Sequence, residues 1–286
     1  MRQLANTAKY NKERVLTAMH PEISELFSLE GQTALITGGG RDLGLDAASI
    51  LAASGCAVAI TSRQQDRARA AAEKLASRYG VATLGLALDQ TRFDDVARVV
   101  DAVLAWRPKL DILINNAGGG VGSSAALLME REPADIALMI ETNLTGVLYC
   151  CRQVGRHMME QHAGRIVNIA SIAGLGGRDR RVYARTGLKG QPVDYAAAKA
   201  GVIGMTRDLA GYLSPHGINV NCISPGGFER GQPEAFIREY SERTPMGRMG
   251  RDGVDLKGAI LFLASPASNY MTGENLTVDG GFVLWK

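Results

Sequence analysis

The amino-acid sequence predicts an α/β protein with a doubly wound, parallel, seven-stranded sheet that carries helices on both faces. From about Gln32 onward, short apolar runs of high β-propensity alternate with longer helical patterns. The runs have no polar face, which is typical of parallel strands that are covered on both sides. A chain of 286 residues is long enough for one large domain of this class.

Seven runs of aliphatic and β-branched residues are the expected strands, at residues 33–37, 57–62, 83–88, 112–115, 165–170, 219–223 and 275–278. Six amphipathic stretches are long enough for crossover helices, at residues 43–54, 65–79, 93–106, 133–160, 195–213 and 252–264. Because crossovers between parallel strands are right-handed, this alternation predicts a doubly wound sheet.

Composition and charge exclude several classes of protein. The net charge of +3 comes from 32 basic and 29 acidic residues with interspersed signs, and no basic run of the kind that binds nucleic acid or a membrane surface occurs. No apolar stretch is long enough for a membrane span. The cysteines have no metal-ligand spacing and are expected to be reduced: Cys56, Cys150, Cys151 and Cys222. We therefore expect a cytoplasmic protein that binds neither metal, membrane nor nucleic acid.

Three parts of the chain are distinguished. Residues 1–28 are expected to form an N-terminal extension, and residues 29–286 the single domain. Within that domain, residues 228–250 are expected to form a substrate-covering loop, with Pro233 opening a helix and Thr244-Pro245 ending it.

A glycine-rich turn, Thr37-Gly38-Gly39-Gly40-Arg41-Asp42-Leu43-Gly44, directly follows the first expected strand. Such a turn lets the backbone approach a pyrophosphate, and the following helix N-terminus supplies favourable amides and a favourable dipole. The turn therefore predicts a dinucleotide site, although a glycine cluster alone is a weak signal.

Four motifs in order make the prediction more specific: Thr37-Gly38 with Gly44, Asn115-Asn116-Ala117-Gly118, Tyr195 with Lys199, and Pro225-Gly226. Together they resemble the short-chain dehydrogenase/reductase family over about residues 27–282. The resemblance implies a Rossmann-like fold. It also implies these cofactor-binding residues: Gly38, Gly40, Arg41, Asp42, Leu43, Gly44, Ser62, Arg63, Asp89, Asn116, Ala117, Gly118, Tyr195, Lys199, Pro225, Gly226 and Phe228.

The cofactor end departs from the family pattern at two places. Asp42 stands where relatives have the middle glycine of the turn, and its charge would repel a pyrophosphate unless the carboxylate turns outward or caps the helix. Ser62 stands where NAD-specific relatives have an acid, and Arg63 follows it. Because guanidinium groups from Arg63 and Arg41 suit a 2′-phosphate, we expect NADP(H) rather than NAD(H).

The expected catalytic residues are Asn143, Ser171, Tyr195 and Lys199. Tyr195 and Lys199 are four positions apart and are expected on one face of a helix, where we expect the ammonium to lower the pKa of the phenol. The resemblance implies that Ser171 holds the substrate oxygen and that Asn143 positions a water for proton relay.

The stretch between Ser171 and Tyr195 is longer than in relatives, and residues 178–189 of this insertion are rich in arginine and lysine. Two interpretations stay open: a substrate lid whose cations, Arg180 and Arg181 among them, hold an anion, or a solvated loop at a subunit contact. Arg230 replaces the threonine of many relatives and is a further candidate for anion recognition.

The resemblance implies an NADP(H)-dependent oxidoreductase that interconverts a secondary alcohol and a ketone, acting on a small-molecule substrate such as a sugar acid or polyol. Relatives of this kind are usually homotetramers. Two alternatives remain open at this point: a 3-oxoacyl-carrier-protein reductase, and a catalytically silent dinucleotide sensor or scaffold.

Overall fold

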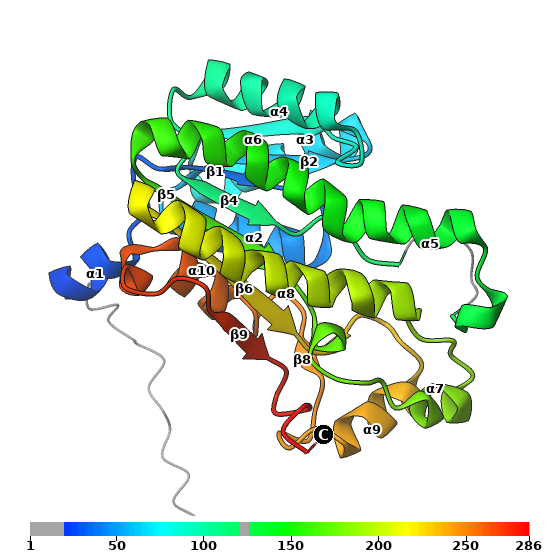
Figure 1. Ribbon diagram of the computed structural model, residues 1–286. Coiled ribbons are helices and arrows are strands. Elements are labelled where there is room, and N and C mark those ends of the chain that lie inside the picture. The colour runs from blue at the N-terminus through cyan, green and yellow to red at the C-terminus, as the bar shows by residue number, and fades with distance from the viewer. Residues whose placement is uncertain (1–19, 121–125, 286) are drawn as a thin grey trace, which may run out of the picture.

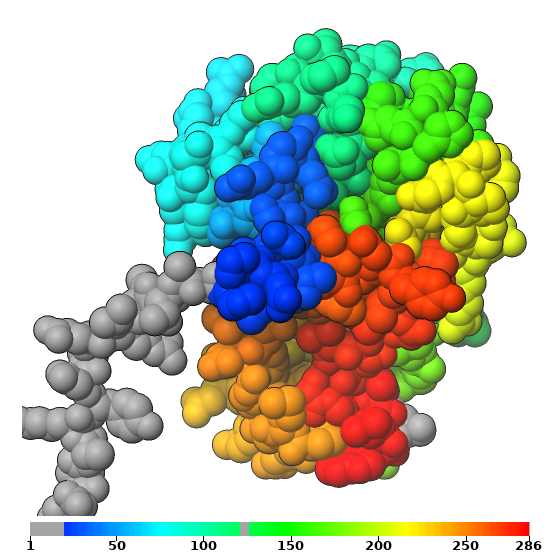
Figure 2. Space-filling model, turned by 90° about the vertical axis from the view of Figure 1, so that its left-hand side faces the viewer, coloured from blue at the N-terminus to red at the C-terminus, as the bar shows by residue number. Residues whose placement is uncertain are grey.

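The computed structural model describes residues 20–120 and 126–285. Most of the expected N-terminal extension therefore lies outside the described residues. Its last part forms α1 (Pro21–Phe27), and Leu29, which follows, is completely buried. Figure 2 shows α1 beside the segment around η5 (Pro266–Ser268), against which it packs.

A seven-stranded sheet in the order β3-β2-β1-β4-β5-β6-β9 forms the centre of the protein (Figure 1). All of its neighbouring strands are parallel. The strands are β1 (Thr33–Ile36), β2 (Ala57–Ser62), β3 (Thr83–Ala87), β4 (Ile112–Asn115), β5 (Gly164–Ile169), β6 (Ile218–Pro225) and β9 (Asn275–Val278). The order reverses between β1 and β4, which confirms the predicted doubly wound topology.

Helices cover both faces of this sheet. One layer contains α4 (Phe93–Trp106), α6 (Gly146–Gln161) and α8 (Val193–Leu213); the other contains α2 (Asp42–Ala53), α3 (Gln65–Tyr79) and α10 (Lys257–Ala264). Alternate side chains of the central strands face opposite layers: Ile36 packs with the α2 side and Leu35 with the α4 side. Two separate apolar cores result, one on each face.

Two predicted helices differ in the structure. The stretch 133–160 divides into α5 (Pro133–Ile140), a π-helical turn η2 (Glu141–Thr145) and α6. The helix expected from residue 252 begins only at Lys257, because Gly253 has a left-handed φ of +75° and the Asp255 carboxylate accepts a hydrogen bond from the Arg251 amide. Both features hold the chain in a turn that its helical propensity opposes.

The insertion and the expected substrate-covering loop both contain short elements. The insertion holds η3 (Ile172–Gly174) and α7 (Arg180–Thr186). The loop at 228–250 holds α9 (Glu234–Glu242), which begins directly after Pro233 as predicted. Its ends, β7 (Phe228–Glu229) and β8 (Gly250–Arg251), pair in parallel.

No helix within residues 20–120 and 126–285 is long and apolar enough to cross a membrane. All four cysteines are buried free thiols, which agrees with the expected reduced state.

Candidate functional site

A cleft of about 800 Å³ opens where the carboxyl ends of the strands meet, at the point where the strand order reverses. It brings together most of the residues expected to bind a dinucleotide. These lining residues are Gly38, Gly40, Arg41, Asp42, Leu43, Ser62, Arg63, Asp89, Asn116, Ala117, Gly118, Tyr195, Lys199, Pro225, Gly226 and Phe228. Ser171 also lines the cleft, whereas Gly44 and Asn143 do not.

Gly44 allows the start of α2 to approach the glycine-rich turn closely. A Cβ atom on Gly44 would stand 2.2 Å from the Gly38 carbonyl oxygen, so only glycine allows α2 to start this close to the turn. Asn116 secures the same turn, because its side-chain amide donates hydrogen bonds to the carbonyl oxygens of Thr37 and Gly38 at 3.0 and 3.2 Å. Gly44 and Asn116 therefore fix the conformation of the turn in which a ligand could bind.

Asp42 adopts the left-handed conformation that its glycine counterpart would tolerate without strain. Its φ is +50°, and its carboxylate makes no cap for α2. The carboxylate instead lies 3.5 Å from the Arg41 guanidinium, with both side chains largely in solvent. Because the Asp42 carboxylate is exposed and lies beside the Arg41 guanidinium, its repulsion of a phosphate at the turn is reduced.

Basic side chains surround the cleft beyond the end of β2. Arg41, Arg63 and Arg67 all line it, together with the neutral Ser62. The sequence motifs do not identify Arg67, which lies in the first turn of α3 four residues after Arg63 and whose side chain lies against Gly40. The acid Asp89 also lines the cleft, where its Oδ1 accepts a hydrogen bond from the Thr91 hydroxyl at 2.7 Å.

Ser171, Tyr195 and Lys199 also line the cleft and lie close together. The Lys199 ammonium lies 5.8 Å from the centre of the Tyr195 ring and donates a 2.7 Å hydrogen bond to the Ile169 carbonyl. Burial lowers the pKa of Lys199 to about 8. Burial raises the pKa of the Tyr195 phenol, while its hydrogen bond with Ser171 acts in the opposite direction. The phenol is therefore protonated at neutral pH.

Asn143 stands behind this group, in the π-helical turn η2, and is completely buried. Its Oδ1 accepts a hydrogen bond from the Gly119 amide at 2.8 Å, and its Nδ2 donates to the Gly119 carbonyl at 3.0 Å. The side chain thus holds the glycine segment that follows β4, close to Lys199. Its place in a water relay stays a prediction.

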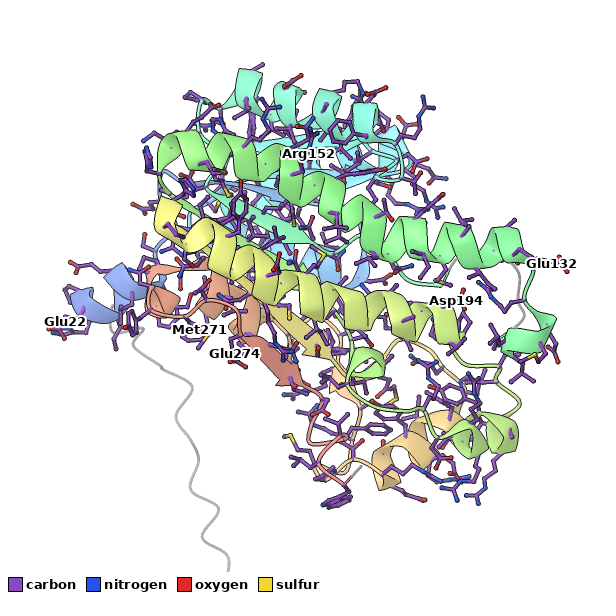
Figure 3. All side chains as sticks on the ribbon, viewed as in Figure 1. Glu22, Glu132, Arg152, Asp194, Met271 and Glu274 are labelled. Atoms are coloured by element: carbon purple, nitrogen blue, oxygen red, sulfur yellow. The ribbon has the colours of Figure 1, made fainter. Side chains whose placement is uncertain are left out.

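A buried ion pair anchors the start of the helix that carries Tyr195. Arg131 Nη2 lies 2.5 Å from the Asp194 carboxylate and also donates to the Asp135 carbonyl in α5 at 3.0 Å. Both charged side chains are almost fully buried. Asp194 lies at the end of α8 nearest α5 (Figure 3). Removing either charge would leave its partner buried and unpaired, so the pair fixes α5 against α8.

Arg230 also lines the cleft, and its Nε lies 2.6 Å from the Asp252 carboxylate. This guanidinium is therefore already engaged by an acid, and its role in anion recognition stays a prediction. Within residues 20–120 and 126–285, no group of three or more His, Cys, Asp or Glu side chains is placed to hold a metal ion.

Two substitutions of Asp42 should distinguish the effect of backbone strain from the effect of the carboxylate charge. Asp42→Gly relieves the positive φ and should raise the free energy of unfolding by about 0.5–1 kcal/mol in urea titrations, whereas Asp42→Asn should not. Both variants remove the charge and should bind a dinucleotide several-fold more tightly in a fluorescence titration. Equal stability of the two variants would contradict the strain argument.

The buried Lys199 should make stability depend on pH. Because its pKa falls from 10.5 to about 8 on folding, the unfolded chain binds the extra proton between these values, and stability increases as pH rises through this window. Lys199→Met should therefore be more stable than the wild type at pH 7, by about 1–3 kcal/mol in urea unfolding. The difference in the free energy of unfolding between the two proteins should be smaller near pH 9.5. Lys74→Met, at an exposed position, serves as the control, and its free energy of unfolding should differ from that of the wild type by the same amount at both pH values.

Comparisons with known proteins agree with this architecture. The family model described as "Enoyl-(Acyl carrier protein) reductase" matches residues 39–283. The 3-oxoacyl-[acyl-carrier-protein] reductase FabG of Aquifex aeolicus is 34% identical over 257 residues, which cover 88% of this chain and 98% of that protein. The NADP-dependent mannitol dehydrogenase of Hypocrea jecorina is 35% identical over 266 residues, covering 90% of this chain and 94% of that protein.

A similar solved structure is the gluconate 5-dehydrogenase of Burkholderia cenocepacia in complex with NADP and tartrate. It superposes with a TM-score of 0.82 at 33% identity, and the match covers 92% of this chain and 99% of that one. The matched family model, the relatives and the fold lead to one conclusion: the chain belongs to the short-chain dehydrogenase/reductase family.

Proposed function

We propose that this protein is an NADP(H)-dependent oxidoreductase that interconverts a secondary alcohol and a ketone. The observation that carries the proposal is the meeting of Ser171, Tyr195 and Lys199 in the same cleft that the glycine-rich turn lines. A silent sensor would have no need for a phenol, a hydroxyl and a buried ammonium placed together in this way.

Ser171, Tyr195 and Lys199 would each have a separate role in the reaction. When bound, the nicotinamide supplies or accepts the hydride. The Ser171 hydroxyl would hold the substrate oxygen, and Tyr195, protonated at neutral pH, would donate its proton to that oxygen as the ketone is reduced. The Lys199 ammonium, fixed to the Ile169 carbonyl, would stabilise the phenolate that remains. Oxidation of the alcohol reverses the proton transfer.

The choice of NADP(H) rests on the charges around β2. Arg41, Arg63 and Arg67 present three guanidinium groups to the cleft, and the neutral Ser62 brings no charge that would repel a 2′-phosphate. The related mannitol dehydrogenase is NADP-dependent, and the similar gluconate 5-dehydrogenase structure contains NADP, which supports the same choice.

The substrate is proposed to be a small polar ketone or its alcohol, such as a sugar acid or polyol. The similarity to a mannitol dehydrogenase and to a gluconate 5-dehydrogenase supports this class. The similarity to 3-oxoacyl-[acyl-carrier-protein] reductases, at 34% identity for the Aquifex protein, favours reduction of a carrier-bound 3-oxoacyl thioester as a second candidate. A homotetrameric assembly and a cytoplasmic location are part of the proposal.

The activity is tested with purified protein and NADPH. We expect oxidation of NADPH with 5-ketogluconate, and a loss of at least about 1,000-fold in kcat for Tyr195→Phe, which keeps the ring but has no proton to donate. Faster turnover of an acetoacetyl thioester would favour the second candidate. Cofactor binding without turnover of any ketone in a broad panel would support the silent alternative.

The cofactor assignment is tested by two arginines of α3. Arg67→Ala should lower kcat/KM with NADPH by about 10-fold or more, while kcat/KM with NADH changes little, because one charged contact to the 2′-phosphate is lost. Arg69→Ala is the matched control, since Arg69 is an exposed residue of the same helix that does not line the cleft. An equal loss with both cofactors would count against a 2′-phosphate contact.

A further inference from the structure

The insertion between Ser171 and Tyr195 is a packed element. Its helix α7 lies against α9 below the carboxyl end of the sheet, as Figure 1 shows. Val182 of α7 belongs to a small apolar cluster with Phe236 and Tyr240 of α9 and with Phe282 near the C-terminus. This cluster holds the insertion in one place beside the cleft.

Two of the basic side chains of this insertion are already paired with acids. Arg181 lies 2.8 Å from Asp179, and Arg185 lies 3.7 Å from Glu239. Both guanidinium groups are largely exposed, and their charges are balanced by these acids. Because Arg181 is already paired with Asp179, its charge is not free to hold an anion in a substrate lid.

Arg178 is held differently. Its Nη1 donates a hydrogen bond to the Gln191 carbonyl, and its guanidinium carbon lies 5.6 Å from the centre of the Tyr183 ring. None of the described acidic side chains forms an ion pair with it. The side chain is half-buried. Nη1 of Arg178 is thus fixed by the backbone, while the guanidinium group has no charged partner among the described residues.

The position of Arg178 connects it to the catalytic end of the cleft. Burial raises the pKa of both the Tyr195 and the Tyr240 phenols, and the charge of Arg178 opposes this rise at each of them, so Arg178 is within electrostatic reach of the proton donor. Gln191, its backbone partner, lies with its side-chain oxygen against Gly120, a residue that lines the cleft. Arg178 therefore stands just beyond the lined cleft, on the Tyr195 side.

We propose that Arg178 is the residue that recognises the substrate, by binding a carboxylate of a hydroxy acid or oxo acid while the reacting oxygen lies at Tyr195. A guanidinium that is fixed through one nitrogen can bind a carboxylate through two parallel hydrogen bonds at little further cost in side-chain entropy. This inference rests on the proposed oxidoreductase activity and narrows its substrate class to anionic ketones and alcohols.

The test compares a charged and a neutral substrate of similar size, for example 5-ketogluconate and fructose, with NADPH as cofactor. Arg178→Ala should lower kcat/KM for the carboxylate by about 10–100-fold, mainly through KM, and that for the neutral ketose by less than about threefold. Arg178→Lys, which keeps the charge but not the fork, should recover part of the loss. Unchanged NADPH binding and melting temperature show that the variants are folded.

Arg181→Ala is the matched control, because it removes a cation from the same insertion that is already paired with Asp179. It should leave kcat/KM for both substrates unchanged. Equal losses on the charged and neutral substrates in Arg178→Ala, or equal effects of Arg178→Ala and Arg181→Ala, would overturn the inference while leaving the oxidoreductase activity intact. Absence of turnover by the wild type with any ketone would instead remove the proposed function itself.

Discussion

The bond from the buried Lys199 ammonium to the Ile169 carbonyl is the constraint around which the catalytic end is organised. It ties the last residue of β5 to the first turns of α8 and so sets Tyr195 opposite Ser171. A buried charge of this kind is costly to folding, and the fold tolerates it because the surrounding elements are held independently. The Arg131–Asp194 pair supports α8, and the bonds from Asn143 to Gly119 support the segment after β4.

The cofactor end depends on a different kind of constraint, namely close backbone approach. Gly44 leaves room both for the Gly38 carbonyl and for the Asn116 amide that donates a hydrogen bond to it. Asp42 shows how far this arrangement can be altered. The chain keeps the left-handed turn with a residue that adopts it less readily than glycine, and the neighbouring Arg41 partly compensates the charge.

The fold and much of the site could be predicted because their signals are local. Strand periodicity, a glycine turn after β1, and the spacing of Tyr195 and Lys199 are all readable within a short window. The rest depends on backbone conformations and side-chain contacts that no sequence pattern specifies. Gly253 and Asp255 delay the start of α10, and Arg178 differs from Arg181 only through the backbone and side chains that surround each. Tertiary structure alone distinguishes two neighbouring arginines of equal charge.

The apolar cluster of Val182, Phe236, Tyr240 and Phe282 is separate from the two cores that cover the sheet. One link to the cofactor cleft is Tyr240, whose hydroxyl accepts a hydrogen bond from the Gly227 amide at 2.6 Å. Side chains on α7 and α9 other than Tyr240 can therefore change without directly touching Gly226 and Gly227. The molecule is modular in this sense, and new substrate preferences can evolve on the smaller core while the hydride-transfer machinery stays as it is.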